Sequence, residues 1–442
     1  MVKPDNSLFG RGMKVGRLGA SLTGSYLAYQ VQNLIQGVDG APDRKKAFQT
    51  KASERARSEL GALKGPIMKL GQVLSMMGHT LPDEAIEELT KLQGQAPAMH
   101  PTLARAQFKG AMGRAPEDCY ASFDDVPFAA ASLGQVHRAT AKDGQELAVK
   151  IQYPGIRTAI ENDFKLLRSA SFPGQITGFV DPKLFAEVER GFMEETDYLI
   201  EAQNLKRFGE AFAPLTYLRI PEVREDLSSD RVLSMSFLPG EPVDDFLARK
   251  PKKALRDQIA YRLMETYQFE LRVIGAFHAD PHPGNYLFAE DGTISLVDFG
   301  CVKHCSPELT ELVDTLVAGD WEERPGGFQR MAELVCGSAK LARTKHGKQL
   351  AQTGIDLYKK LFPEPRPGRR KVDFANKDFL FALTDMWNDA IRSKITNPEY
   401  AFASRAELGL TNLLHCFRAR VDTALLRQRV TEYMEGKRPE LE

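Results

Sequence analysis

Two motifs in the second half of the chain constrain the fold more than any other feature. The first is His278-x-Asp280-x-x-x-x-Asn285, in the stretch GAFHADPHPGNYLF, and the second is DFG at 298–300. Their spacing and residue types match the catalytic loop H-R-D-x-x-x-x-N and the D-F-G of protein kinases. NYLF and TISLVDFG flank the turn AEDG, so we expect a β-hairpin to join the motifs. A carboxylate and an amide oxygen from the two sides of a hairpin can hold Mg²⁺ between phosphates.

A third pattern, earlier in the chain, has the spacing of a kinase glycine-rich loop. It reads Ala129-x-Ala131-x-x-Gly134-x-Val136, with alanine at two of the three glycine positions. Small residues at the tip of such a hairpin let the backbone approach phosphates, and alanine keeps this property while stiffening the loop. Fourteen residues after Val136, Lys150 lies in the strand-like run LAVKIQ, where a kinase carries the lysine that contacts the α- and β-phosphates.

An inward-pointing lysine in an apolar strand requires an anionic partner. The stretch EETDYLIEAQN offers candidates inside a predicted helix over residues 181–212. On a continuous helix Glu194, Asp197 and Glu201 share one face, and Glu195 points elsewhere. The ordered set of small-residue loop, strand lysine, helix glutamate, catalytic loop and DFG is hard to obtain by chance, whereas each motif alone is weak.

The opening motif has one alternative interpretation and marks one departure from protein kinases. A metal cluster of His278, Asp280 and His282 would need a further ligand, so it is disfavoured.

The position two after Asp280, usually lysine, is His282, and histidine is mostly neutral at pH 7. After DFG no A-P-E segment follows, because CVKHCSPELTEL leads straight into a helical pattern. The surface on which protein kinases bind peptides is therefore expected to be missing.

The remaining pattern predicts an α+β protein with two lobes. Helical periodicity runs from Lys45 to about Gly113, two strands follow around a turn at 143–144, and a long helix covers about 252–275. Lys plus Arg and Asp plus Glu both number 59, so the zero net charge gives no electrostatic case for nucleic acid. Five cysteines without CxxC spacing argue against a disulfide framework or zinc ribbon, and we expect a reducing cytoplasm. The chain shows no 18-residue apolar run and no signal-peptide pattern, so neither a transmembrane helix nor a leader is expected.

Residues 14–36 can form a helix in which small side chains recur at every fourth position: Gly16, Ala20, Gly24 and Ala28. This spacing makes one face that a partner backbone can approach closely, and the basic end can meet anionic head groups. The segment is consistent with self-association as a homodimer, with binding to a membrane surface, or with packing on the protein's own body.

Together with IMKLGQVLS upstream, these motifs closely resemble the UbiB (AarF) family of atypical protein-kinase-like proteins. The resemblance covers about residues 61–320, and its most specific marks are Lys69-x-Gly71-Gln72, AAASLGQVHRA, Glu195-x-Asp197 and HADPHPGN. It implies a bilobal kinase-like fold in which a helical extension carrying K-x-G-Q covers the active site. It also implies four segments: an N-terminal helix and linker over 1–42, the extension over 43–125, an N-lobe over 126–238 and a mostly helical C-lobe over 239–442.

The resemblance also implies site roles. Lys69 would pair with Glu195, and Lys150 with Glu201. The catalytic residues would be Asp280, Lys150 and Glu201. The metal ligands would be Asn285 and Asp298. The regulatory residues would be Lys69, Gly71, Gln72, Glu195 and Asp197. The nucleotide would bind at Ala129, Ala130, Ala131, Ser132, Gly134, Val136 and Lys150, with Met235 to Leu238 as the hinge against adenine.

The function implied by the resemblance is Mg²⁺-dependent ATP hydrolysis or atypical kinase activity that supports isoprenoid-quinone (ubiquinone) biosynthesis. The expected partners are ATP, an isoprenoid lipid or quinone precursor, and a membrane surface bound peripherally from the cytoplasm. Two alternatives stay open: a small-molecule phosphotransferase of the aminoglycoside- or choline-kinase type, and a scaffold that binds nucleotide and lipid without turnover.

Overall fold

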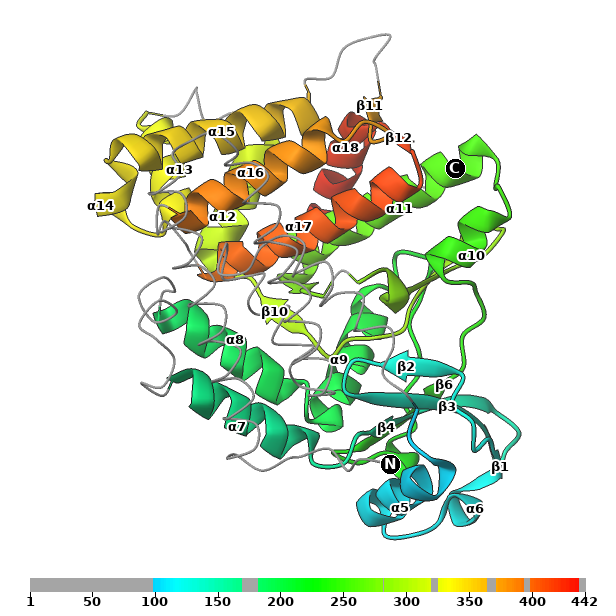
Figure 1. The fold of residues 1–442 in the computed structure, drawn as a ribbon. Helices are drawn as coiled ribbons and strands as arrows, with labels where there is room; N and C mark the ends of the chain where they lie inside the picture. The colour runs from blue at the N-terminus through cyan, green and yellow to red at the C-terminus, as the bar shows by residue number, and fades with distance from the viewer. Residues whose placement is uncertain are drawn as a thin grey trace, which may run out of the picture. The chain divides into compact units, whose positions relative to one another are not determined.

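The computed structural model describes residues 98–168, 182–280, 282–318, 325–363, 371–392 and 398–436. The fold is mixed α+β, as predicted (Figure 1). The chain forms two compact units: the first includes the described residues up to Leu199 together with Arg224–Met235, and the second comprises Ile200–Val223 and the chain from Ser236 onward. The helix predicted over 14–36 and the K-x-G-Q segment lie outside the described residues.

A sheet forms the centre of the first unit. Its strands are β1 (Tyr120–Phe123), β2 (Ala129–Ala131), β3 (Gly134–Ala141), β4 (Glu146–Gln152) and β6 (Val232–Ser236). The order is β1-β3-β4-β6, with β2 paired to β3. The predicted hairpin between β3 and β4 is confirmed, because the strands pair antiparallel and Gly144 at their turn has φ of 91°. A positive φ is a conformation that glycine adopts without steric cost.

Helices α5 (Pro101–Met112) and α6 (Pro116–Cys119) precede the sheet. α5 begins with proline at its first turn and ends where Gly113, in the left-handed conformation, donates its N–H to Lys109 O. Phe108 of α5 packs on Tyr120, with the ring centroids 5.7 Å apart. Leu147, Val149 and Ile151 of β4 belong to the same core. Because side chains alternate along a strand, Lys150 and its neighbours two residues away lie on the other face of β4.

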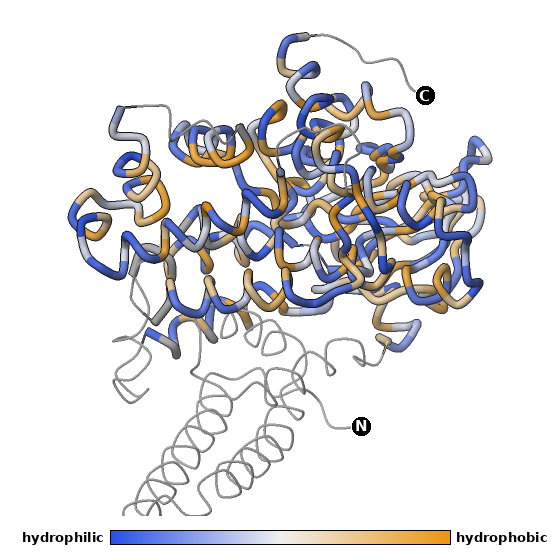
Figure 2. Tube along the Cα trace, turned by 90° about the horizontal axis from the view of Figure 1, so that it is seen from above, coloured by the Kyte–Doolittle hydropathy of each residue, from blue (hydrophilic) through white to orange (hydrophobic). Residues whose placement is uncertain are grey.

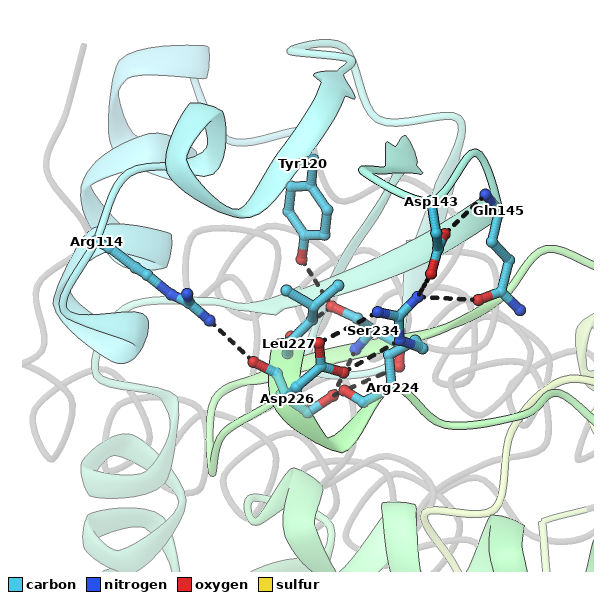
Figure 3. Close-up of polar contacts among 9 residues, drawn as sticks. Arg114, Tyr120, Asp143, Gln145, Arg224, Asp226, Leu227 and Ser234 are labelled. Atoms are coloured by element: carbon cyan, nitrogen blue, oxygen red, sulfur yellow. Dashed lines mark hydrogen bonds and ion pairs between the residues drawn. The ribbon is translucent and has the colours of Figure 1, made fainter.

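Residues 224–235 are held to the first unit by a polar network, drawn in Figure 3. Arg224 donates to Asp143 Oδ2 at 2.8 Å and to Gln145 Oε1 at 3.2 Å, both beside the β3–β4 turn. Tyr120 and Ser234 share a buried hydroxyl–hydroxyl bond of 2.7 Å. These contacts explain why a segment so distant in the sequence is part of this unit.

The helix predicted over 181–212 is wrong as a single element. The structure has α8 (Pro182–Glu194), preceded by α7 (Ile156–Arg168), and then α9 (Tyr198–Ala211). Between α8 and α9, Thr196 Oγ1 bonds to Met193 O, and Asp197 Oδ1 accepts the N–H of Leu199. Short polar side chains that bond to nearby backbone groups compete with helix continuation.

The break has a consequence for the acidic residues of this stretch. Glu194 ends α8, Asp197 lies in the connection, and Glu201 belongs to the first turn of α9. The three residues therefore do not share the face of one continuous helix, and that part of the sequence interpretation is wrong.

The second unit contains the predicted hairpin between the two catalytic motifs. β8 (Tyr286–Phe288) and β9 (Ile294–Leu296) pair antiparallel, and Gly292 in their turn has φ of 81°. β5 (Leu218–Arg219) pairs with β9 in parallel, and β7 (Ala276–His278) pairs with β10 (Val302–His304). The strand β10 lies where only a helical pattern was expected after DFG.

Helices make up the rest of the second unit. α11 (Lys253–Phe269) continues as a π-helical turn over Glu270–Ile274 and stops at Gly275, whose φ is 67°. The other helices are α10 (Val243–Ala248), α12 (Pro307–Ala318), α13 (Gly327–Cys336), α14 (Ala339–Ala342), α15 (Lys345–Leu361), α16 (Asp378–Arg392), α17 (Pro398–Cys416) and α18 (Thr423–Met434), with β11 (Val372–Asp373) paired to β12 (Arg420–Val421). Neighbouring pairs include α15 with α16, α16 with α17, and α11 with α17 and α18. Apolar and polar residues are interspersed along the described chain (Figure 2).

Two further expectations can be compared with the described residues. All five cysteines are free, as expected from their spacing. Within the described ranges, no helix has the length and apolar character needed to cross a membrane.

Candidate active site

The catalytic loop connects β7 to β8 and is closed by its own side chains. Asn285 Nδ2 donates to the carbonyl oxygen of Asp280 at 2.9 Å. His282 accepts the N–H of Gly284 on Nδ1 at 3.0 Å and so caps the short 3₁₀ turn over Pro283–Asn285. These two bonds fix the backbone of the loop at Asp280 and over Pro283–Asn285.

The backbone brings the DFG segment against this loop at both ends. Val297 N–H donates to Asn285 O at 3.1 Å, and Ala279 N–H donates to Cys301 O at 2.8 Å. Asp298 Oδ1 accepts the N–H of Gly300 at 3.0 Å, which orients its carboxylate. Asn285 is therefore paired opposite the residue that precedes Asp298, and the structure brings these two predicted ligands together. Their role as metal ligands stays a prediction.

The donor set suits Mg²⁺. Asn285 commits its amide nitrogen to Asp280 O, so the amide oxygen is the group that it can offer to a cation. Asp298 adds a carboxylate, and oxygen ligands of these two kinds are those that Mg²⁺ prefers. Across the described residues, no three His, Cys, Asp or Glu side chains are arranged to hold a metal, which includes the alternative cluster of His278, Asp280 and His282.

Helix α9 holds the phenylalanine of DFG through the backbone. Glu201 Oε1 accepts the N–H of Phe299 at 3.3 Å, and Asn204 Nδ2 donates to Phe299 O at 3.0 Å. The Phe299 ring is fully buried and lies 4.9 Å from Phe208 and 5.5 Å from His278, between ring centroids. Sequence reasoning missed Asn204, although its position three residues after Glu201 places both side chains on one helix face.

A buried polar cluster lies behind the catalytic loop. Glu270, in the π-helical turn, is 3% exposed and accepts the N–H of His278 at 3.3 Å. Burial raises the pKa of Glu270 to about 8 and lowers the pKa of His278. A cavity of about 20 Å³, lined among others by Glu270, His278 and Tyr286, has room for one water molecule. π-helical turns often mark functional regions of helices.

In the first unit, Lys150 is buried on β4. It is 4% exposed, and its Nζ lies 5.6 Å from the ring centroid of Tyr198. On the same strand, Gln152 Nε2 donates to Thr196 O at 2.9 Å, so the connection between α8 and α9 covers this face of β4. Glu201 belongs to the second unit. The Lys150–Glu201 pair therefore stays a prediction.

The small-residue loop forms a tight hairpin. Ala129, Ala130 and Ala131 of β2 pair with Val136, Gln135 and Gly134 of β3, which leaves Ser132 and Leu133 as the turn. Ala129, Ala130 and Ser132 are exposed, and Leu133 is buried. Gly134 is required by close packing, because a Cβ there would lie 2.3 Å from Ile151 O and 2.9 Å from the Tyr198 hydroxyl.

The residues predicted to form the hinge lie where the chain passes from the first unit to the second. Met235 is buried near the end of β6, and the chain enters the second unit at Ser236, two residues before the half-buried Leu238. Gly240 then adopts φ of 142° beside Leu287, where a Cβ would lie 2.8 Å from the Leu287 Cβ. Contact of the hinge with adenine stays a prediction.

A model of the ABC1 atypical kinase-like domain matches residues 91–323, which is more than half of the chain. The chain belongs to this family. The resemblance to UbiB-type proteins is therefore confirmed.

Relatives of known name support the same placement. The chain is 33% identical over 262 residues to the Arabidopsis thaliana protein "ACTIVITY OF BC1 COMPLEX KINASE 7, chloroplastic", covering 58% of this chain and 38% of that one. It is 30% identical over 328 residues to the Caenorhabditis elegans "Atypical kinase coq-8, mitochondrial", covering 71% of this chain and 43% of that one. The chain thus spans less than half of the length of these two relatives.

A solved structure extends the likeness beyond the matched domain. It is the complex of Rv3197 with erythromycin from Mycobacterium tuberculosis, and its protein is 26% identical to this chain with a TM-score of 0.60. The match covers 88% of this chain and 98% of that one. The likeness to this structure therefore covers more of the chain than the family model does.

The regulatory residues predicted for this ABC1 protein are only partly described. Lys69, Gly71 and Gln72 lie outside the described residues. Glu195 and Asp197 lie in the connection between α8 and α9, where Asp197 caps the first turn of α9 through the N–H of Leu199. Their regulatory role stays a prediction.

One polar contact of the catalytic loop was not predicted. Arg405 of α17 places its Nη2 3.0 Å from Asp280 Oδ1, and both side chains are largely buried. No local motif predicts the contact of Arg405 with Asp280. Arg405 lies 125 residues from Asp280, in a helix that carries none of the kinase motifs.

Proposed function

We propose that this ABC1 protein is a Mg²⁺-dependent ATPase that acts at a membrane surface in isoprenoid-quinone metabolism. The observation that carries the catalytic part is the pairing of Asn285 with the segment before Asp298, beside an Asp280 held by that same asparagine. The metabolic part rests on the resemblance of the motifs to the UbiB family. The helix predicted over 14–36 would supply the peripheral membrane contact, and Lys69, Gly71 and Gln72 the cover over the site.

Each catalytic side chain has a task in this proposal. Phosphoryl transfer depends mainly on positioning and on neutralising phosphate charge. Asn285 and Asp298 would hold Mg²⁺, which when bound would neutralise charge on the phosphates. Lys150 contacts the α- and β-phosphates. Asp280 orients the attacking water and accepts its proton, while the backbone of Ala129–Gly134 covers the phosphates.

The test measures ATP hydrolysis by the purified protein with and without anionic vesicles and a prenylated phenol. Asp280→Asn and Asp298→Asn should each lower the rate by at least about 100-fold, because charge placed on the transferring group supplies most of the acceleration. Asp245→Asn, on the exposed side of α10, is a matched control that should leave the rate unchanged.

Three outcomes separate the candidate functions. Hydrolysis that survives in Asp298→Asn would exclude the proposed site. Nucleotide binding without any Asp280-dependent turnover would favour a scaffold. No response to vesicles or to the phenol would remove the membrane-lipid part and leave the ATPase part intact.

Transfer to a small molecule is a second candidate function. It is favoured by the similar Rv3197 structure, in which the bound molecule is erythromycin. Product analysis distinguishes the two: a phosphorylated acceptor formed in the same amount as ADP indicates transfer, and free phosphate alone indicates hydrolysis.

A further inference from the structure

The carboxylate of Asp280 is held by a cation from a distant helix. Arg405 Nη2 donates to Asp280 Oδ1 at 3.0 Å, and the two side chains are 24% and 18% exposed, respectively. A charge-assisted bond in such a sheltered place is stronger than one between neutral groups. It therefore restricts the rotation of the Asp280 carboxylate, the group proposed to orient the attacking water.

The part of α17 that carries Arg405 is fixed by independent contacts. Tyr267 of α11 donates its hydroxyl to Ala403 O at 3.0 Å in a buried position. Lys303 of β10 lies with its Nζ 4.8 Å from the ring centroid of Phe402. These contacts join α17 to α11, which leads into the catalytic loop, and to β10, which follows DFG. Arg405 therefore projects from a packed helix, so its position relative to the loop is well defined.

The loop carries histidine at the position where protein kinases carry lysine. That position is His282, whose Nδ1 accepts the N–H of Gly284 at 3.0 Å. Its side chain is committed to capping the turn over Pro283–Asn285. A positive charge next to Asp280 comes from α17.

We propose that Arg405 is a positioning residue of the phosphoryl-transfer reaction, which holds the Asp280 carboxylate from α17. This inference rests on the proposed ATPase function. In the step, the water oxygen forms a bond to the γ-phosphorus while the bond to the β–γ bridging oxygen breaks, and its electron pair stays with ADP. The water proton passes to the Asp280 carboxylate and then to solvent. Arg405 acts through Asp280, by holding the carboxylate in the orientation that this transfer requires.

The test compares Arg405→Gln, Arg405→Lys, Asp280→Asn and the double variant Asp280→Asn/Arg405→Gln in the full chain. Arg405→Gln should lower kcat by about 10- to 100-fold, the range expected when a reacting group is misplaced. The KM for MgATP should stay within about 2-fold, since Arg405 is not proposed to bind nucleotide. Arg405→Lys should recover part of kcat, because it restores a cation.

The double variant separates positioning from a purely structural role. If Arg405 acts only through Asp280, then in the Asp280→Asn background its removal should cause no further loss of rate in single-turnover assays with labelled ATP. The double variant also removes both members of the ion pair, so it leaves no unpaired half-buried charge that could prevent folding. Arg330→Gln, which breaks an exposed pair with Glu311, is the matched control and should leave kcat unchanged.

The following results would overturn the inference. A wild-type kcat in Arg405→Gln would show that Asp280 needs no positioning by Arg405. A raised kcat would show that the ion pair between Arg405 and Asp280 inhibits the reaction. Losses that add up in the double variant and accompany a lower melting temperature would show a structural role. If Asp280→Asn and Asp298→Asn also retain full activity, the ATPase proposal itself falls; if they are inactive while Arg405→Gln is active, only the Arg405 inference falls.

Discussion

The buried Glu270 should make the stability of this protein fall as the pH rises. Glu270 is 3% exposed, and burial raises the pKa of its carboxyl from the usual 4.5 to about 8. An unfolded chain releases this proton near pH 4.5, whereas the folded chain keeps it until about pH 8. The folded state therefore binds the proton more tightly. The stabilising contribution is complete below about pH 4.5 and is lost progressively up to about pH 8.

The size of the effect follows from that interval. Each pH unit between the two pKa values corresponds to about 1.4 kcal/mol, so the full window amounts to about 5 kcal/mol. Glu270→Gln keeps an oxygen that accepts the N–H of His278 and removes the ionisable group. The cavity beside it has room for a water to satisfy the new amide. We expect equal stabilities at pH 5 to within about 1 kcal/mol, and at pH 8 a variant that is more stable by about 4 kcal/mol.

Urea unfolding of both proteins at pH 5, 6, 7 and 8 would measure this difference. Glu290→Gln is the matched control, because Glu290 is 81% exposed and should show no such pH dependence. If the stability difference between Glu270→Gln and the wild type were the same at pH 5 and pH 8, the tight binding of a proton by Glu270 would be refuted.

Two further substitutions test the geometry of the site. Gly134→Ala would place a Cβ 2.3 Å from Ile151 O, so β3 and β4 must shift apart. We expect a lower melting temperature. We also expect a fluorescent ATP analogue to bind at least about 10-fold more weakly, because a displacement of binding groups by about 1 Å is costly. Gly110→Ala in α5 is the control, with open space around its Cβ, and should be neutral or stabilising by up to about 1 kcal/mol. Asn204→Ala removes the donor to Phe299 O and should lower stability by about 1 kcal/mol and reduce kcat, as measured by urea unfolding and ATP hydrolysis.

Each of these two predictions has an outcome that contradicts it. Unchanged nucleotide affinity in Gly134→Ala would mean that the hairpin tolerates the shift and that its fit to phosphate is not critical. Full activity in Asn204→Ala would mean that the hold on Phe299 does not govern the position of Asp298.

Local turns were predictable because their cause lies in a few adjacent residues. Asp143-Gly144 and Asp291-Gly292 both predicted hairpins, and in both the glycine adopts the positive φ that closes the turn. The second hairpin was decisive, because it joins Asn285 to the segment before Asp298. The prediction that these two residues lie together required only the spacing of the motifs and the pairing of two strands.

Element boundaries failed where side chains compete with the backbone. The apolar periodicity over 181–212 predicts one helix, yet Thr196 and Asp197 bond to nearby backbone groups and divide it. The same limit applies to the helix over 252–275, whose last turn is π-helical from Glu270. Periodicity reports which residues face the core, and it does not report where a hydrogen-bonding register changes.

The sequence by itself determined the family, the α+β class and the hairpin that brings Asn285 beside the segment before Asp298, because each depends on residue types at short and regular spacings. Only the tertiary structure decided what surrounds Asp280 and Phe299. Arg405 reaches Asp280 across 125 residues, and Glu201 and Asn204 hold the Phe299 backbone from a helix almost 100 residues earlier. Such pairs form because packing of α9, α11 and α17 brings distant side chains together, and no local pattern in the chain encodes that packing.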